Sequence, residues 1–333
     1  MTFELAAWGV TFGTLLAAVL RAAAPIILAA MGGLISDLAG STNVALEGIM
    51  LIAAFFGAIA SGYAAIWFPG SPIWFYALFG LVCGVGAGVL VSGLLAVFHL
   101  ELGADIIVAG IGVNILAAGL TVFLLFSLTG DKGSTAQLTT FMLPNISMPF
   151  LDGVPWLDPI FNGDGGNGHN MIVYIALIAA PLLAVLLYRT RFGLRLRAVG
   201  ENREAALASG ISVRKIQYSA LLLSGLLASL GGVFLSMGYL NLFQADMTGG
   251  RGFLALAAVF LGARNPWGTL VAALVFGAST VFAARLGAFD VPSQIIFMIP
   301  PTLTLIALVG FNIRQERVAR RKIKQAAAQL KAA

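Results

Sequence analysis

The sequence predicts an all-α membrane protein whose chain crosses the bilayer many times. Of its 333 residues, 59% are hydrophobic and only 10% are charged, and the mean hydropathy is +0.97. Soluble globular proteins carry about 25% charged residues, so this chain has too little polar surface for a water-soluble fold. Its 40 glycines suit membrane helices that pack closely together.

Ten apolar stretches are candidate membrane spans, each of which needs about 20 mostly apolar residues. Arg21 alone separates the first two, and an arginine at the bilayer centre costs about 2.5–3.5 kcal/mol on insertion scales. We therefore expect a tight hairpin with Arg21 near an interface, while one long span there would lower the count to nine. The eighth stretch is short, and we expect it to be broken or extended by its neighbours. The ten stretches are 5–20, 22–38, 46–67, 74–98, 104–128, 171–188, 218–238, 252–263, 267–286 and 292–311.

Basic residues gather in two regions that flank apolar stretches. Residues 189–217 contain seven arginines and lysines against two glutamates, and residues 314–333 contain seven more against one glutamate. Residues 130–170 contain a single lysine against four aspartates. Cytoplasmic loops carry the excess of positive charge, so the first two regions are predicted to be cytoplasmic and the third external. We thus expect one transmembrane domain over 1–313, followed by a basic cytoplasmic tail.

The sequence offers no catalytic or metal-binding constellation. His99 and His169 are far apart without a partner cluster at ligand spacing, and Cys83 is the only cysteine. No nucleotide-binding motif of the form GxxxxGK[ST] is present. We therefore predict that the chain is not an enzyme and holds no metal and no cofactor.

Two polar stretches interrupt the apolar pattern and precede similar apolar segments. Residues 32–48 and 241–252 are rich in Ser, Thr, Asn, Asp and Gly. Irregular backbone at membrane depth must be buried in protein or line a wet cavity, although ordinary connecting loops are the alternative. "GIMLIAAFFGA" at 48–58 and "GFLALAAVFLGA" at 252–263 share four positions when aligned from the first glycine. This similarity indicates an inverted repeat with a path near the midplane, or arises by chance in Ala/Gly-rich sequence.

A short charged segment, "GENREAALASG" at 200–210, lies within the first basic region. Asn202 is a suitable N-cap, the residues from Glu204 onward favour helix, and Gly210 suits the C-terminal end. We expect a short helix on the cytoplasmic surface, where it provides a rigid contact site for a cytoplasmic partner protein.

Several segments together resemble the permeases of bacterial ABC importers of the branched-chain amino acid/ribose permease family. They are "GLISDLAGSTNVALEGIMLIAAFFGA" (33–58), "GADIIVAGIGVNILAAGLT" (103–121), "RTRFGLRLRAVGENREAALASGISV" (189–213) and "GRGFLALAAVFLGARNPWGTLVAALVFG" (250–277). The pattern is most similar to nucleoside permeases that work with a basic-membrane-protein-type lipoprotein. The resemblance implies a type II-like permease architecture in the bacterial inner membrane. Its "EAA…G" coupling motif falls on Glu204, Ala205, Ala206 and Gly210.

The resemblance also implies partners and a path. The partners are cytoplasmic ATPase subunits that bind the ATP, a second and non-identical permease subunit, and an extracytoplasmic substrate-binding lipoprotein. Separately, basic residues that flank apolar stretches indicate contact with membrane lipid and not with nucleic acid. Asn43 and Asn114 would offer amide hydrogen bonds to a base or ribose, or else join helices. Phe55 and Phe253 would stack on the base, or else face lipid or core. The remaining candidates for the path are Glu47, Gly48, Arg251 and Gly252.

Two other interpretations stay open. The same permease family would also accommodate ribose-like sugars or branched-chain amino acids as substrates. A proton-coupled secondary transporter would instead use Asp37, Glu47 or Asp105 as proton carrier, but it leaves the short charged helix without a role.

Overall fold

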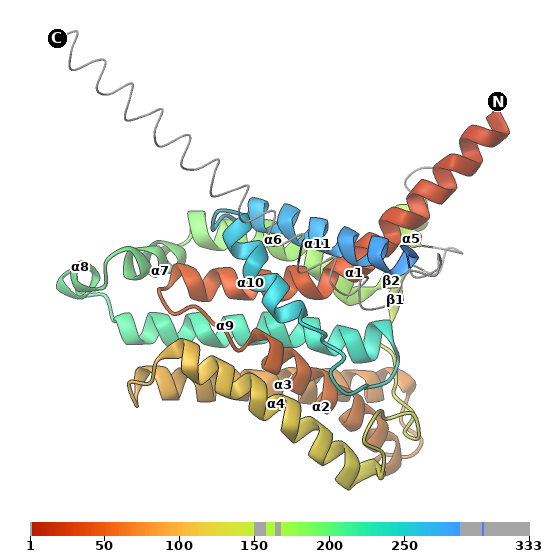
Figure 1. The fold of residues 1–333 in the computed structure, drawn as a ribbon, viewed down its shortest axis with the longest axis horizontal. Helices are drawn as coiled ribbons and strands as arrows, with labels where there is room; N and C mark the ends of the chain where they lie inside the picture. Colours follow the sequence, from red (N-terminus) through yellow and green to blue (C-terminus); the bar gives the residue numbers. More distant parts are fainter. Residues whose placement is uncertain (1, 150–157, 164–167, 287–301, 303–333) are drawn as a thin grey trace.

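Long apolar helices lie side by side and make up most of the described part of the computed structural model, which describes residues 2–149, 158–163, 168–286 and 302 (Figure 1). Seven described helices are long and apolar enough to cross a membrane. The long helices are α1 (Thr2–Leu38), α2 (Leu46–Trp67), α3 (Ile73–Leu100), α4 (Ile106–Thr129), α6 (Met171–Arg189), α9 (Val213–Phe234) and α11 (Pro266–Leu286). The shorter elements are β1 (Asn145–Ile146), α5 (Asp158–Asn162), β2 (His169–Asn170), α7 (Arg191–Glu201), α8 (Arg203–Ala208), the π-helix η3 (Leu235–Tyr239) and α10 (Arg251–Leu261).

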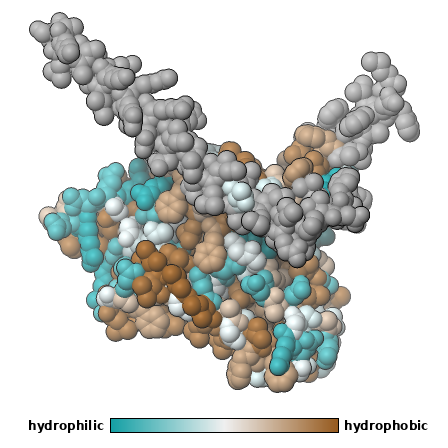
Figure 2. All heavy atoms as spheres, viewed as in Figure 1, coloured by the Kyte–Doolittle hydropathy of each residue, from teal (hydrophilic) through white to brown (hydrophobic). Residues whose placement is uncertain are grey.

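The bundle has two ends of different character. We call the end that carries α7 and α8 the basic end, and the end that carries β1, β2 and α5 the loop end (Figure 1). Figure 2 shows hydrophilic residues gathered at both ends of the visible face, with more hydrophobic residues between them. Many large apolar side chains of the described helices are exposed, including Val82, Leu90 and Phe123. This distribution is that of a protein surrounded by lipid.

The first two predicted spans form one helix, so the expected hairpin at Arg21 is wrong. Helix α1 runs without a break through Arg21 and Pro25. The residues around Arg21 are leucine and alanine, which favour helix, and no turn residue interrupts them. Arg21 stands 17 residues before Leu38, about 26 Å along the helix, which places it near the far edge of a hydrocarbon layer about 30 Å thick. The count of ten spans is not confirmed, and the predicted span 292–311 and the tail 314–333 lie outside the described residues.

The described part of the predicted external loop is folded against the bundle. Strands β1 and β2 pair antiparallel, with Ile146 opposite His169. The Tyr174 hydroxyl of α6 lies 2.7 Å from the carbonyl oxygen of Phe161 and 2.9 Å from that of Ile146. Helix α5 contacts α1, where a Cβ added to Gly13 would meet the ring of Pro159. These contacts make the described loop a cap over one end of the bundle.

Small residues let the central helices approach closely, as the glycine content predicts. A Cβ added to Gly84 of α3 would stand 2.6 Å from the carbonyl oxygen of Ala53 in α2. A Cβ added to Gly232 of α9 would overlap the carbonyl oxygen of Met50 in α2. Helix α2 therefore packs closely against α3 and α9 through backbone contacts, and this packing holds the start of α2 in place.

Candidate functional site

Helices α2 and α10 both begin inside the bundle, away from its two ends (Figure 1). The non-helical residues 39–45 lead inward from the basic end to α2, and residues 240–250 lead inward from the loop end to α10. From this common region α2 runs to the loop end and α10 runs to the basic end. The two similar segments at 48–58 and 252–263 therefore run in opposite directions.

Glu47 joins the starts of these two helices. Its Oε1 accepts a hydrogen bond from the Gly250 N–H at 2.7 Å, and its Oε2 accepts one from the Gly252 N–H at 2.5 Å. The side chain is nearly buried, so this carboxylate satisfies two N–H groups at the start of α10 that have no partner within the helix. It also places negative charge where the positive ends of two helix dipoles meet. A Cβ added to Gly252 would overlap the Glu47 backbone, so the approach requires glycine.

Asn114 of α4 holds the first turn of α2 from the other side. Its Oδ1 accepts from the Gly48 N–H at 2.8 Å, and its Nδ2 donates to the Val44 carbonyl at 3.0 Å. A Cβ added to Gly48 would stand 2.9 Å from Asn114. Both amide functions of Asn114 are thus used in joining α4 to α2.

Asn43 is fully buried just before α2. Its Nδ2 donates to the Ser224 hydroxyl of α9 at 3.0 Å, and its Oδ1 accepts from the Ala45 N–H at 3.0 Å. Ser224 lies eleven residues into α9, about 17 Å from the start of that helix at the basic end. Asn43 therefore lies at membrane depth, and protein groups satisfy its amide.

The other three predicted path residues differ in their surroundings. Arg251 Nη1 donates to the carbonyls of Met247 and Thr248 at 2.9 and 3.0 Å, within the turn that precedes α10. Phe55 is fully buried and packs edge-on against Phe243, with ring centroids 5.1 Å apart. Phe253 is 50% exposed on the outside of α10. The structure thus brings Asn43, Glu47, Gly48, Asn114, Arg251 and Gly252 together and leaves the two phenylalanines apart from each other.

One feature near the site was not predicted from the sequence. Asp37, at the end of α1, pairs with Arg264 in the turn between α10 and α11, with Nε 2.8 Å from Oδ2. The Thr42 hydroxyl donates to Asp37 Oδ1 at 2.8 Å. Sequence alone shows two opposite charges 227 residues apart, and no spacing rule connects them.

The predicted short helix is present as α8, at the tip of the basic end (Figure 1). Asn202 caps it as expected, accepting from the Ala205 N–H at 3.0 Å, and Gly210 follows it with a φ of +76°. Glu204, Ala205 and Gly210 are exposed, whereas Ala206 is buried. Helix α8 therefore presents one face to solvent and is anchored by the other.

Helix α7 was not predicted as a separate element and joins α6 to α8. Thr190 caps it, accepting from the Gly193 N–H at 3.1 Å. Gly193 and Leu196 are buried, while Leu194 and Arg195 are exposed. This alternation is typical of a helix that lies on the surface of a bundle.

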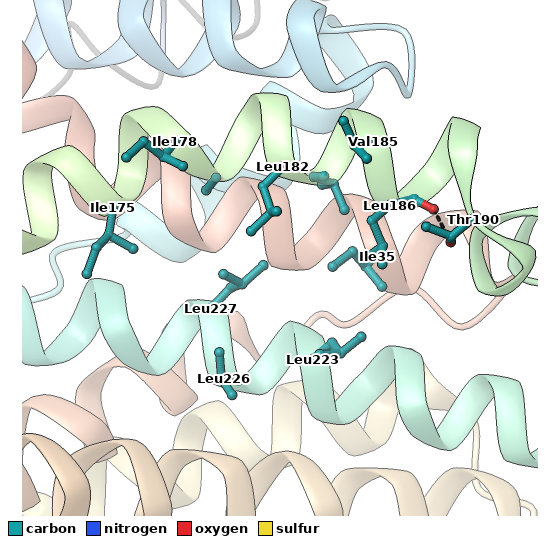
Figure 3. A pocket seen from close by; sticks show the side chains of 12 residues that line it. Ile35, Ile175, Ile178, Leu182, Val185, Leu186, Thr190, Leu223, Leu226 and Leu227 are labelled. Atoms are coloured by element: carbon teal, nitrogen blue, oxygen red, sulfur yellow. Dashed lines mark hydrogen bonds between the residues drawn. The ribbon is translucent and has the colours of Figure 1, made fainter.

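An apolar groove of about 450 Å³ opens between α6 and α9 over Ile35 of α1 (Figure 3). Its lining contains a single polar side chain, Thr190, whose hydroxyl donates to the Leu186 carbonyl at 2.6 Å. A polar solute would find no hydrogen-bond partner there, and burying it would be unfavourable. The groove is therefore poorly suited to a polar substrate, whereas the junction of α2 and α10 gathers polar groups at membrane depth and is the candidate site.

Comparison with known proteins shows the family of the chain. Residues 15–309 match the model of the branched-chain amino acid transport system / permease component family. The chain is 35% identical over 293 residues to the nucleoside ABC transporter permease protein NupC of Lactococcus lactis subsp. cremoris, covering 86% of this chain and 88% of that protein. It is 35% identical over 304 residues to the guanosine ABC transporter permease protein NupQ of Bacillus subtilis, covering 87% and 89%.

The fold has a counterpart among solved structures. A structure described as an inward-facing conformation of a metal-chelate type ABC transporter superposes with a TM-score of 0.50 and 18% identity, over 89% of this chain and 85% of the other. Proteins of this kind are transport components rather than enzymes. The match over most of the length places the chain in the family of branched-chain amino acid transport system permease components, as an ABC transporter permease.

Proposed function

We propose that this chain forms the translocation path for nucleosides in a bacterial ABC importer driven by separate ATPase subunits. The observation that carries the proposal is the exposed helix α8, which presents Glu204 and Ala205 at the tip of the basic end of an ABC permease fold. The 35% identity to permeases named for nucleosides and for guanosine supports the substrate class.

The basic end then faces the cytoplasm and the loop end faces outside. Arginines of α7 and α8 flank the bundle at the basic end, as the distribution of charge in membrane proteins favours. In this orientation α8 meets the ATPase that binds ATP, and the folded cap at the loop end meets an extracytoplasmic substrate-binding lipoprotein. A second, non-identical permease subunit completes the path in the cell membrane, and the basic tail is cytoplasmic.

The path runs past the junction of α2 and α10. The opposite directions of the two helices support an inverted repeat, whose interface is where transporters of this kind bind their substrates. The hydrogen bonds of Asn43 and Asn114 within the protein support a closed path in the described conformation. A nucleoside contacts these amides only after Asn43 leaves Ser224 of α9 and Asn114 of α4 leaves the start of α2. Stacking on Phe55 requires its ring to leave Phe243, whereas the half-exposed Phe253 needs no such movement.

A proton-coupled mechanism is less well supported. Asp37 is ion-paired, both oxygens of Glu47 accept backbone hydrogen bonds, and Asp105 is exposed and caps α4. Each of these carboxylates thus has a structural role in the described conformation, which gives no support to a carrier role.

Uptake measurements test the proposal. Cells with and without the gene are given labelled guanosine, uridine, ribose or leucine. Uptake is measured before and after ATP depletion, with the proton gradient held constant. We expect gene-dependent nucleoside uptake that stops with ATP depletion. Uptake that survives ATP depletion and collapses with the proton gradient would overturn the ABC mechanism, and uptake of ribose or leucine alone would overturn the substrate.

A further inference from the structure

Residues 37–47 hold the short helix α10 at both of its ends. At the basic end, Arg264 follows α10 and pairs with Asp37, with its Nη2 donating to Oδ1 at 3.4 Å in addition to the Nε contact at 2.8 Å. At the interior end, Glu47 caps α10 through two backbone N–H groups. Two carboxylates ten positions apart in the sequence therefore fix the two ends of one eleven-residue helix.

The segment between these carboxylates is itself tied down. Thr42 donates to Asp37, and the Asn43 N–H donates to the Ser36 hydroxyl at 3.1 Å. The Asp37 side chain is only 2% exposed, although its partner Arg264 is 59% exposed. Gly33 of α1 packs against both Leu46 and Val259, so α1 also binds the segment to α10. Residues 37–47 and α10 thus form one block with many internal contacts.

This block touches the region that leads to α8. A Cβ added to Gly200 of α7 would overlap the Leu38 carbonyl oxygen and would stand 3.2 Å from the Gly40 nitrogen. Gln217 Nε2 of α9 donates to the Ala39 carbonyl at 3.3 Å. Contact between two backbones leaves no flexible side chain to absorb a displacement. A movement of α7 is therefore passed directly to residues 38–40.

The turn after α10 depends on the ion pair. Ala263 and Arg264 have φ angles of +54° and +57°, a region that costs energy for residues other than glycine. The contact of Arg264 with the buried Asp37 carboxylate helps to hold this conformation. If the contact were lost, the C-terminal end of α10 would be free to leave residues 37–47.

We propose that residues 37–47 and α10 move as a single unit when the ATPase displaces α7 and α8. The Asp37–Arg264 pair keeps the C-terminal end of α10 in that unit. Asp37 and Arg264 are then positioning residues for transport rather than substrate ligands. The inference rests on the proposed function, because that function supplies the ATP-driven displacement.

The test uses the complete transporter in proteoliposomes, with uptake of labelled guanosine and ATP hydrolysis measured together. Asp37→Asn and Arg264→Gln each break the pair, and the exchange Asp37→Arg with Arg264→Asp restores it in reverse. Glu101→Gln is the matched control, because Glu101 pairs with Arg214 at the same end of the bundle but outside residues 37–47. We expect guanosine uptake per ATP hydrolysed to fall about tenfold in both single variants, to recover in the exchange, and to stay unchanged in the control.

Hydrogen exchange of the peptide at 248–261 gives a measurement that does not depend on transport. If the unit is real, Asp37→Asn accelerates exchange at the interior start of α10, far from the substituted residue, and Glu101→Gln does not. Unchanged exchange, or an unchanged ratio of uptake to hydrolysis in Asp37→Asn, would overturn the inference. A wild-type protein that hydrolyses ATP without importing guanosine would instead overturn the proposed substrate, while the exchange experiment still tests the unit.

Discussion

The Glu47 carboxylate lies 2.5 Å from the Gly252 nitrogen, so the first turn of one membrane helix caps the first turn of another. Two helix starts that point toward each other bring two partial positive charges together. One carboxylate relieves this repulsion and satisfies N–H groups that have no partner within α10. The Glu47 carboxylate therefore stabilises the junction, and we expect its removal to destabilise the starts of both α2 and α10.

Gly252→Ala is expected to destabilise the bundle by about 1–3 kcal/mol, since the added methyl group overlaps the Glu47 backbone. Thermal unfolding of the purified protein in detergent measures the loss. Gly112→Ala and Gly119→Ala are matched controls on α4, because a Cβ at either position meets no atom within 4 Å. Equal stability of Gly252→Ala and the controls would show that the close approach is not required.

Asn114→Leu is expected to cost about 1–3 kcal/mol, because it leaves the Gly48 N–H and the Val44 carbonyl buried without partners. Asn114→Asp keeps the acceptor for Gly48 but loses the donor to Val44, so its loss of stability should be intermediate. The same unfolding measurement orders the three proteins. A Leu variant as stable as wild type would contradict the assignment of both hydrogen bonds.

Glu204→Arg is expected to leave the protein folded and inserted but to reduce ATP-driven uptake by at least about tenfold, the scale of a lost coupling free energy. Because Glu204 is exposed, the substitution alters the contact with the ATPase and not the packing of the bundle. Uptake is compared at equal amounts of membrane-inserted protein. Glu201→Arg supplies the control, since it makes the same charge change at an exposed position outside α8. Normal uptake by an assembled Glu204→Arg variant would exclude α8 as the coupling element.

His169 is expected to make the cap at the loop end sensitive to acid. Burial lowers the pKa of its imidazole below the ordinary 6.5, and the positive charge of Arg21 lowers it further, while the hydrogen bond to the Ile160 carbonyl opposes the shift. The unfolded state therefore binds the proton more tightly. The stabilisation is complete above pH 6.5 and is lost as the pH falls toward the lowered value, by at most about 1.4 kcal/mol per pH unit.

Limited proteolysis of the loop at pH 7.5 and pH 5.5 measures this effect, with faster cleavage expected at pH 5.5. His169→Gln, which does not titrate, should reduce the difference between the two pH values once the pH dependence of the protease itself is subtracted. A difference that is the same in both proteins would assign the acid sensitivity to another group.

Local rules predicted much of the fold. Apolar length located the long helices, and the residues at 202–210 were enough to predict α8 and its cap, because a short helix is decided by its own end groups. The same rules failed at Arg21, where a charge was expected to interrupt a helix. The helix is long enough to carry that charge to the membrane edge, so no interruption is needed.

The candidate site shows where sequence reasoning stops. Polar residues in apolar surroundings predicted which residues gather, including Asn43, Glu47 and Asn114, but not whether they face a substrate or each other. Ser224, the partner of Asn43, lies far away in the sequence and was not predicted. Gly252 was predicted to border the path, but no spacing rule joins it to Glu47. The same holds for Phe55, since the sequence of an apolar helix looks the same whether its aromatic residue lines a path or packs in the core.

The separation of Glu47 from Gly252 by 205 positions also has a consequence for synthesis. At about 5–20 residues per second, roughly 10–40 s pass between the emergence of the carboxylate and that of its backbone partners. During that interval α2 enters the membrane with an uncapped acid, and every helix through α9 is complete before the junction closes. We therefore expect the junction to form only after helices α1 to α9 have been made, so that ribosome-bound chains stopped before residue 250 expose Glu47 to carboxyl-modifying reagents that no longer reach it in the finished protein.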